Sequence, residues 1–211
     1  MKLTVRPVLA VAVCAALAAG TGIAAAAPAA ACNLLKDAKG DGTALLVLPS
    51  GGPSDGAWDI LSADLASTKK GLTTVVRVDK LAQTAATSPT GVHWRVDFKV
   101  GDVELYTSVV ADAVDGLSGN FGYIDPDTGV GSSLGGAAPV LDMAKNEVRI
   151  TVPDKAFGAR ATLKKAGTQL TGLAATAGRF YNFGAVTLSE GTDSAATEAS
   201  YTTGTPSCVK K

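Results

Sequence analysis

The chain has 211 residues, of which 46% are hydrophobic and 18% charged, and its 19 basic residues balance its 19 acidic ones. A nearly neutral chain without a basic stripe argues against nucleic acid or an anionic membrane surface as a partner. Once a leader is set aside, about 180 residues remain, which suits a single domain with a full hydrophobic core.

The first residues have the layout of a secretory signal peptide. Two basic residues precede an uninterrupted apolar run over residues 8–19, and a stretch of small residues follows it. This pattern predicts a signal peptide over residues 1–26, a single mature domain over residues 27–211, and a secreted protein. Cleavage after Ala29 fits the small-residue rule equally well. The alternative is an uncleaved membrane anchor, but the apolar run is short for a span of about 20 residues.

Cysteine usage points to the same compartment. Cys14 lies in the predicted leader, so the mature chain keeps Cys32 and Cys208 near its two ends. In an oxidising compartment we predict a disulfide between them, worth about 4 to 5 kcal/mol in the chain-entropy model. The alternative is a lipoprotein anchored to the cell surface through an acylated Cys32, which leaves Cys208 without a partner.

The mature chain begins irregularly and then alternates. Residues 33–56 carry Gly, Pro and Asp throughout, with one short apolar strand predicted at residues 44–48. Residues 58–67 and 72–81 form a predicted hairpin around a turn at Lys69, Lys70 and Gly71. The residues expected on its apolar face are Leu61, Ala63 and Leu65 in the first strand and Leu72, Thr74, Val76 and Val78 in the second.

The clearest element is a second hairpin over residues 91–110. Apolar side chains alternate with polar ones from Val92 to Val100, the period expected of a strand with one buried face. Gly101-Asp102 then supplies a type II′ turn with glycine at its first central position. This turn fixes the register, and the predicted pairs are Trp94 with Val109, Val96 with Thr107, Phe98 with Leu105, Lys99 with Glu104 and Val100 with Val103.

Further short strands follow the second hairpin. We predict them at residues 120–124, 147–152, 168–177 and 197–203, with Gly-rich connections between them and one helical turn at residues 153–157. Around eight short strands without a long helical period predict an all-β antiparallel sandwich, jelly-roll-like, with one or two short helical turns.

The order of these features resembles a known architecture. CNLLKDAKGDG, WDILSADLAS, a strand pair containing HWRVDF, and KNEVRITVP follow one another as in β-sandwich modules of secreted actinobacterial proteins. The chain also distantly resembles the DOMON and family 9 carbohydrate-binding group. The resemblance covers most of the mature chain. It implies an extracellular module that binds something small or supports a partner and is not an enzyme.

Calcium is the best-supported site hypothesis. Asp37 and Asp41 lie in a Gly-bearing loop, while Asp55 and Asp59 flank the entry to the next strand, so several hard oxygen ligands could converge. The predicted ligands are Asp37, Asp41 and Asp59, and the resembled group implies a structural calcium in such a loop. The alternative is that these aspartates only stabilise turns and caps.

Ligand binding would require exposed aromatic side chains. Tyr106 falls on the outer face of the second hairpin, and Phe180, Tyr181 and Phe183 lie in a run that we predict to be a loop between Gly178 and Gly184. These four residues are the predicted ligand-binding set. The alternative is that they pack into the core, as we expect for Trp58, Trp94, Phe98 and Phe121.

Signals of catalysis are weak. His93 is the only histidine, and no GxSxG motif accompanies it, so a strand-borne solvated imidazole is the simpler interpretation. One histidine and two paired cysteines do not complete a usual zinc site. We therefore expect a secreted, monomeric, non-catalytic module that binds a glycan, a small ligand or another secreted protein. The alternatives are a structural cell-envelope protein and a hydrolase whose carboxylates the sequence does not single out.

Overall fold

The computed structural model describes residues 32–44, 55–81, 90–113, 115–164, 166–183 and 186–209. The predicted signal peptide and most of the strand predicted at residues 44–48 lie outside the described residues.

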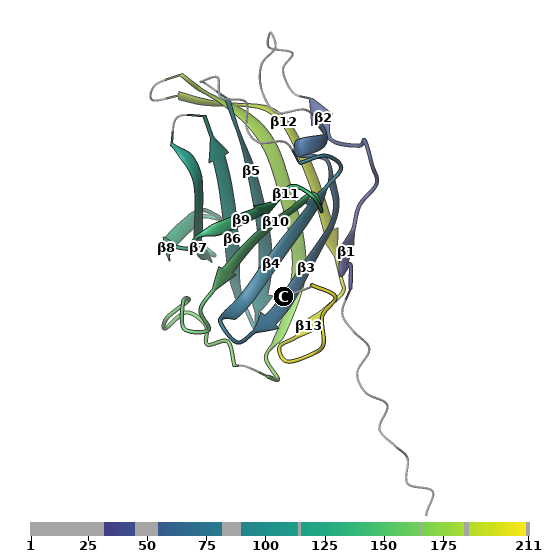
Figure 1. Ribbon diagram of the computed structural model, residues 1–211. Coiled ribbons are helices and arrows are strands. Elements are labelled where there is room, and N and C mark those ends of the chain that lie inside the picture. The colour runs from purple at the N-terminus through teal and green to yellow at the C-terminus, as the bar shows by residue number, and fades with distance from the viewer. Residues whose placement is uncertain are drawn as a thin grey trace, which may run out of the picture.

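Two antiparallel sheets pack face to face and form a β-sandwich (Figure 1). This confirms the predicted fold class. The smaller sheet has the order β1 (Leu35–Lys36), β3 (Ile60–Thr68), β4 (Gly71–Val78), β10 (Glu147–Val152), β9 (Pro139–Asp142). The larger has the order β2 (Thr43–Ala44), β12 (Val186–Thr197), β11 (Gln169–Phe183), β5 (Thr90–Val100), β6 (Val103–Asp112), β7 (Gly116–Ile124), β8 (Gly131–Gly136), with β13 (Tyr201–Thr202) paired to β11.

The hairpin of β5 and β6 has the predicted register. All five predicted pairs are observed, from Trp94 opposite Val109 to Val100 opposite Val103. Gly101 has a φ of 59°, as the first central residue of a type II′ turn requires. Val92, Trp94 and Phe98 are buried in the core, so the alternation predicted both the strands and the face that they bury.

The hairpin of β3 and β4 departs from the prediction at one residue. Its strands pair around the Lys69-Lys70 turn as expected, but the register shifts between Ile60 and Ser62. Such a bulge places an extra residue in one strand and reverses the alternation beyond it. Ile60 is therefore fully buried, and Leu61, which we expected in the core, is half-buried.

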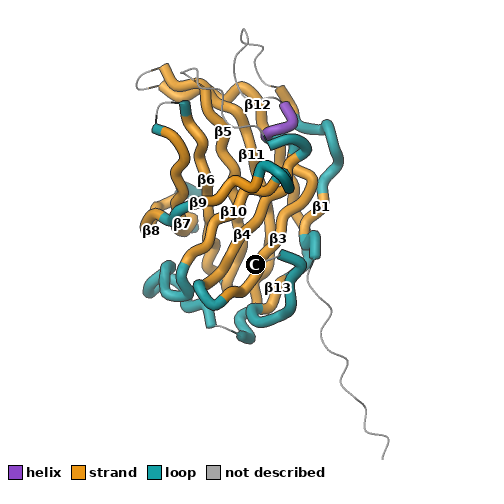
Figure 2. The backbone as a smooth tube through the Cα atoms, viewed as in Figure 1, coloured by secondary structure: helices purple, strands orange, loops and turns teal. Residues whose placement is uncertain are grey.

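The later part of the chain contains more strand than predicted (Figure 2). β11 continues through residues 179–183, so the prediction of a loop there is wrong. The Gly-rich connection after residue 129 contains β8. Residues 153–157 form hydrogen-bonded turns, with the Ala156 amide donating to the Pro153 carbonyl, instead of a helical turn. Within the described residues, the single helical element is the 3-10 turn Asp55–Ala57.

The core lies between the inner faces of the two sheets. The indole nitrogen of Trp94 donates to the Ala57 carbonyl oxygen at 2.8 Å, and the hydroxyl groups of Thr74 and Thr107 meet at 2.8 Å between the sheets. Phe157 covers one end of the core and contacts Phe98 edge to face, with ring centroids 5.9 Å apart. These polar groups are hydrogen-bonded, which avoids the cost of burying them unpaired, whereas Trp58 Nε1 is buried without a hydrogen-bond partner among the described residues.

The two ends of the described chain are joined covalently. Cys32 and Cys208 form a disulfide with their Cα atoms 5.1 Å apart and a sequence separation of 176 positions. The predicted bridge is confirmed, and it fits an extracellular protein. Among the described residues, no helix has the length and apolar character needed to cross a membrane.

Candidate functional site

Three carboxylates converge at one end of the sandwich. Asp37 and Asp41 lie between β1 and β2, and Asp193 lies in β12; each offers an oxygen, and these oxygens are all within 4.8 Å of one another. We call Asp37, Asp41 and Asp193 the acid cluster. Two of its members were predicted from the sequence, whereas Asp193 was missed.

These residues come together because the chain crosses from the smaller sheet to the larger one between β1 and β2. β1 pairs with β3 in the smaller sheet, and β2 pairs with β12 in the larger one, so residues 37–42 connect the two layers. Trp58 packs between Gly42 and Gly191, where a Cβ on either glycine would collide with the indole ring. This close approach holds the loop of Asp41 against the strand that carries Asp193.

Hydrogen bonds orient two of the three carboxylates. Asp193 is buried and accepts the amides of Ile60 at 2.6 Å and Ser194 at 2.7 Å, one on each oxygen. Asp37 Oδ1 accepts the amide of Ala38 at 3.0 Å. Asp37 Oδ2 is buried and has no hydrogen-bond partner among the described residues, which is costly for a carboxylate oxygen unless a ligand compensates it.

The other predicted ligands are placed differently. Asp59 is buried close by, but its two oxygens accept the Gly40 amide at 3.0 and 2.9 Å, so it orients the loop and stands outside the acid cluster. Asp55 begins the 3-10 turn, and its side chain is not among those described. Lys39 points away from the cluster and pairs with Asp79 at 2.7 Å.

The electrostatics of the acid cluster favour a bound cation. Burial raises the pKa of Asp193, and repulsion from Asp37 and Asp41 raises it further. Burial likewise raises the pKa of Asp37, with repulsion from Asp41 and Asp59. In the described part of the chain, no lysine or arginine forms an ion pair with a member of the cluster. The negative charge is therefore not neutralised by an ion pair within the described residues.

A second set of buried charges lies on the outer face of the smaller sheet. Arg77 pairs with Asp64 and donates through Nε to Glu147 at 2.8 Å, and Arg149 pairs with the other oxygen of Glu147. We call these four residues the arginine network. Burial alone raises the pKa of Glu147, but its bonds to Arg149 and Arg77 outweigh burial and leave that pKa below its usual value.

The predicted ligand-binding aromatic residues are buried. Tyr106, Phe180 and Tyr181 expose 6%, 9% and 6% of their surface. The ring of Tyr106 lies over Gly122, with Arg95 stacked on it at 4.4 Å, and the ring of Phe180 lies over Gly91. The rings of Tyr106 and Phe180 thus each cover a glycine on a neighbouring strand. None of the three offers an exposed ring for stacking, and their role in binding stays a prediction.

Phe183 and His93 lie on neighbouring strands of the larger sheet, β11 and β5. The side chain of Phe183 lies outside the described part, although its backbone ends β11. His93 is half-buried next to Phe180, with ring centroids 6.2 Å apart, instead of solvated as predicted. Burial lowers the pKa of His93, and the charge of Arg95 adds to this effect, so its imidazole is neutral at pH 7.

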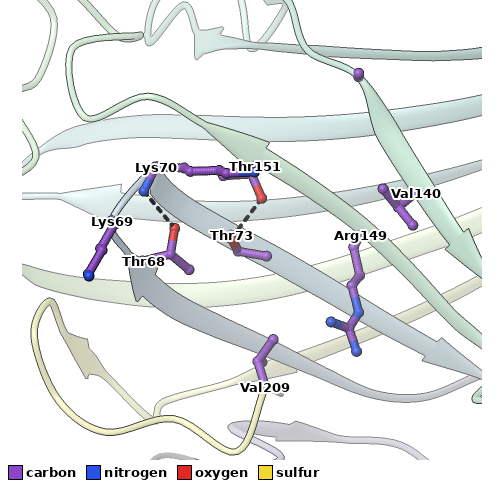
Figure 3. A pocket seen from close by; sticks show the side chains of 9 residues that line it. Thr68, Lys69, Lys70, Thr73, Val140, Arg149, Thr151 and Val209 are labelled. Atoms are coloured by element: carbon purple, nitrogen blue, oxygen red, sulfur yellow. Dashed lines mark hydrogen bonds between the residues drawn. The ribbon is translucent and has the colours of Figure 1, made fainter. Parts of the chain in front are cut away.

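A groove of about 530 Å³ lies on the outer face of the smaller sheet (Figure 3). Its floor is formed by Thr73 and Thr151, whose hydroxyl groups meet at 2.8 Å. No residue of this groove was predicted as a site from the sequence, because each side chain is ordinary for an outward strand position or a turn. The acid cluster lies near the start of β3, and the groove lies near its end.

Comparison with known proteins found no matching family model, no matching curated protein and no matching solved structure. The resemblance to the DOMON and family 9 carbohydrate-binding group stays a prediction.

Proposed function

We propose that this protein is a secreted, non-catalytic β-sandwich module that binds a calcium ion at the acid cluster. The observation that carries the proposal is the convergence of three carboxylates around a buried, unpartnered Asp37 oxygen. The disulfide between the chain ends and the predicted leader support secretion.

The ligand chemistry favours calcium over other common metals. Carboxylate oxygens are hard ligands that suit Ca²⁺ and Mg²⁺, whereas zinc prefers nitrogen and sulfur ligands. Calcium accepts an irregular set of six to eight oxygens, while Mg²⁺ requires near-ideal octahedral geometry. The cluster joins a loop to a strand at unequal depths, with Asp41 exposed and Asp193 buried, and this arrangement suits the more adaptable ion.

A bound calcium ion would tie the two sheets together. Its ligands come from the crossing between β1 and β2 and from β12, an inner neighbour of β2 in the larger sheet. Calcium would offset the burial and the mutual repulsion that together raise the pKa of Asp37 and Asp193. The ion would therefore stabilise the folded state and leave the unfolded chain unaffected.

Thermal unfolding with and without calcium tests the proposal. Extracellular calcium modules bind with dissociation constants of about 10⁻⁴ to 10⁻³ M, so 10 mM CaCl₂ should stabilise the protein by about 1.5 to 3 kcal/mol relative to EDTA. For a domain of this size the melting temperature should rise by about 3 to 10 °C. Equal concentrations of MgCl₂ should give less than half of this rise.

Two variants and one control locate the effect. Asp37→Asn and Asp193→Asn should each lose most of the calcium-dependent rise, whereas Asp127→Asn, in an exposed turn, should keep it. If the wild-type melting temperature stays the same from EDTA to 10 mM CaCl₂, the proposal is wrong. An equal rise in all four proteins would place calcium elsewhere and would also overturn it.

A further inference from the structure

The groove on the smaller sheet has a mostly apolar interior. Thr73 and Thr151 satisfy each other's hydroxyl groups, so the floor presents few free polar atoms. One wall carries Ala138 and Val140, and Val140 is 58% exposed, so the groove presents an accessible apolar side chain. Val209 closes another side. Its volume of about 530 Å³ falls within the range of small-molecule sites.

The rim of the groove is positively charged. Lys69 and Lys70 form the turn at one end, and Arg149 lies at the other, as Figure 3 shows. Among the described residues that line the groove, none is acidic. Arg149 is engaged by Glu147, whereas both lysines are exposed and form no ion pair in the part of the chain that the structure describes. This local excess of positive charge stands out in a chain with equal numbers of basic and acidic residues.

The turn holds its lysines in a fixed place beside the groove. Thr68 Oγ1 accepts the Lys70 amide at 3.2 Å and donates to the Gly71 carbonyl oxygen at 3.0 Å. Gly71 has a φ of 134°, and a Cβ there would overlap the Val152 carbonyl oxygen. Glycine thus allows the turn to lie directly against β10, the strand that supplies Thr151 and Arg149.

We propose that the groove binds a small amphipathic carboxylate. The apolar body of the ligand lies over the threonine floor and against Val140, and its carboxylate faces Lys69 and Lys70. A small ligand fits better than a glycan, because no aromatic side chain is found among the described residues that line the groove. This binding goes beyond the proposed calcium function and does not depend on it, since the two sites lie near opposite ends of β3.

Titration of the full, oxidised chain with decanoate tests this inference. Backbone amide shifts in the NMR spectrum should change in a saturable way at Thr73, Val140 and Thr151 when decanoate is added below its micelle concentration. Acetate supplies the charge without the body, and decyltrimethylammonium supplies the body with the opposite charge. Both should bind at least tenfold more weakly than decanoate.

Substitutions at the rim distinguish binding that depends on the lysine charges from nonspecific hydrophobic binding. Lys70→Gln should weaken decanoate binding about threefold, and Lys69→Gln with Lys70→Gln about tenfold, because exposed ion pairs contribute modestly. Lys80→Gln, an exposed lysine beyond the far end of β4, is the matched control and should leave the affinity unchanged. All three positions are at the surface, so each variant should melt at the wild-type temperature.

Three outcomes would overturn the inference. These are the absence of saturable shifts at the groove, equal binding of decyltrimethylammonium, and equal loss of affinity in the Lys80→Gln control. Since the readout requires no metal, the titration in EDTA also separates a failed groove from a failed calcium site. Calcium-dependent melting without decanoate binding would leave the proposed function intact.

Discussion

The arginine network and the acid cluster both bury carboxylates near the smaller sheet, but they compensate the charge differently. In the arginine network, Asp64 and Glu147 share Arg77, and Arg149 adds a second cation. In the acid cluster, three carboxylates face one another, and a buried oxygen of Asp37 has no hydrogen-bond partner in the part of the chain that the structure describes. The pKa of Glu147 is accordingly lowered, whereas the pKa values of Asp37 and Asp193 are raised.

This difference shows where the protein depends on its surroundings. Burying a carboxylate costs several kcal/mol unless a cation and hydrogen bonds compensate it. The arginine network contains its own cations and is complete within the chain. In the acid cluster Asp193 is equally buried, but no lysine or arginine of the described residues forms an ion pair with it.

The largest expected effect on stability comes from removing Arg77, the central cation of the arginine network. Arg77→Met leaves Asp64 buried without a counterion and takes one of two arginines from Glu147. We expect a loss of about 3 kcal/mol in the free energy of unfolding, at the lower end for a broken buried pair because the arginine is partly exposed. Urea denaturation with the disulfide intact measures this loss.

Lys99→Met is the matched control for that variant. It breaks an exposed pair with Glu104 and should change stability by about 0.5 kcal/mol or less. Equal losses for the two variants would show that the arginine network is no more important than a surface ion pair.

A smaller effect is expected from disturbing the geometry of the acid cluster without changing its charge. In Gly191→Ala the new Cβ would come 2.8 Å from Trp58 Cζ2, and overpacking of this kind costs about 2 kcal/mol. The shift of β12 should also reduce the calcium-dependent rise in melting temperature by half or more. Gly136→Ala, where the nearest atom is 3.5 Å from the new Cβ, is the control. If Gly191→Ala responds to calcium like the wild type, the packing of Trp58 does not affect calcium binding at the acid cluster.

The smallest expected effect tests whether the charge of Asp37 destabilises the folded protein in the absence of calcium. In EDTA, Asp37→Asn should stabilise the protein by about 0.5 kcal/mol at pH 7, because it removes like-charge repulsion of the size found for partly exposed pairs. The folded pKa of Asp37 lies above its unfolded value of 3.8, so the folded state binds the extra proton as the pH falls. The advantage of the variant should therefore shrink as the pH falls toward the folded pKa and disappear below pH 3.8.

The measurement is the difference in urea midpoint between Asp37→Asn and wild type from pH 4 to pH 7. Asp127→Asn serves as the reference for a carboxylate outside the cluster. A difference that grows toward low pH would mean that Asp37 is stabilised in its charged form, which contradicts the comparison between the two sets of carboxylates.

The sequence predicted those strands whose alternation and turn agree. In the hairpin of β5 and β6, the two-residue connection that begins with Gly101 is compatible with few turn types. The apolar residues then determine the register. The bulge at Ile60 has no such marker, because Ile60 and Leu61 are equally suited to the core. β8 consists of Gly, Ser and Leu, a composition typical of loops, and its pairing with β7 outweighs that preference.

Only the part of the acid cluster that lies close together in the sequence was predicted. Asp37 and Asp41 lie close together in a Gly-bearing loop, so local composition indicates them. Asp193 reaches Ile60, which is 133 positions away in the sequence, and only the pairing of β2 with β12 brings it there. The aromatic run ending at Phe183 was misplaced because Gly178 suggests a loop boundary, whereas this glycine makes room for the imidazole of His93 on the neighbouring strand.

The bond between Cys32 and Cys208 also determines how the module responds to mechanical tension. A pull applied to the flanking chain ends is carried by the sulfur–sulfur bond, so the 176-residue span between these cysteines is bypassed and the sheets bear no load. After reduction, the same pull would reach β1 and the C-terminal strand first. An oxidised module therefore behaves as an inextensible link between whatever is attached to its two ends.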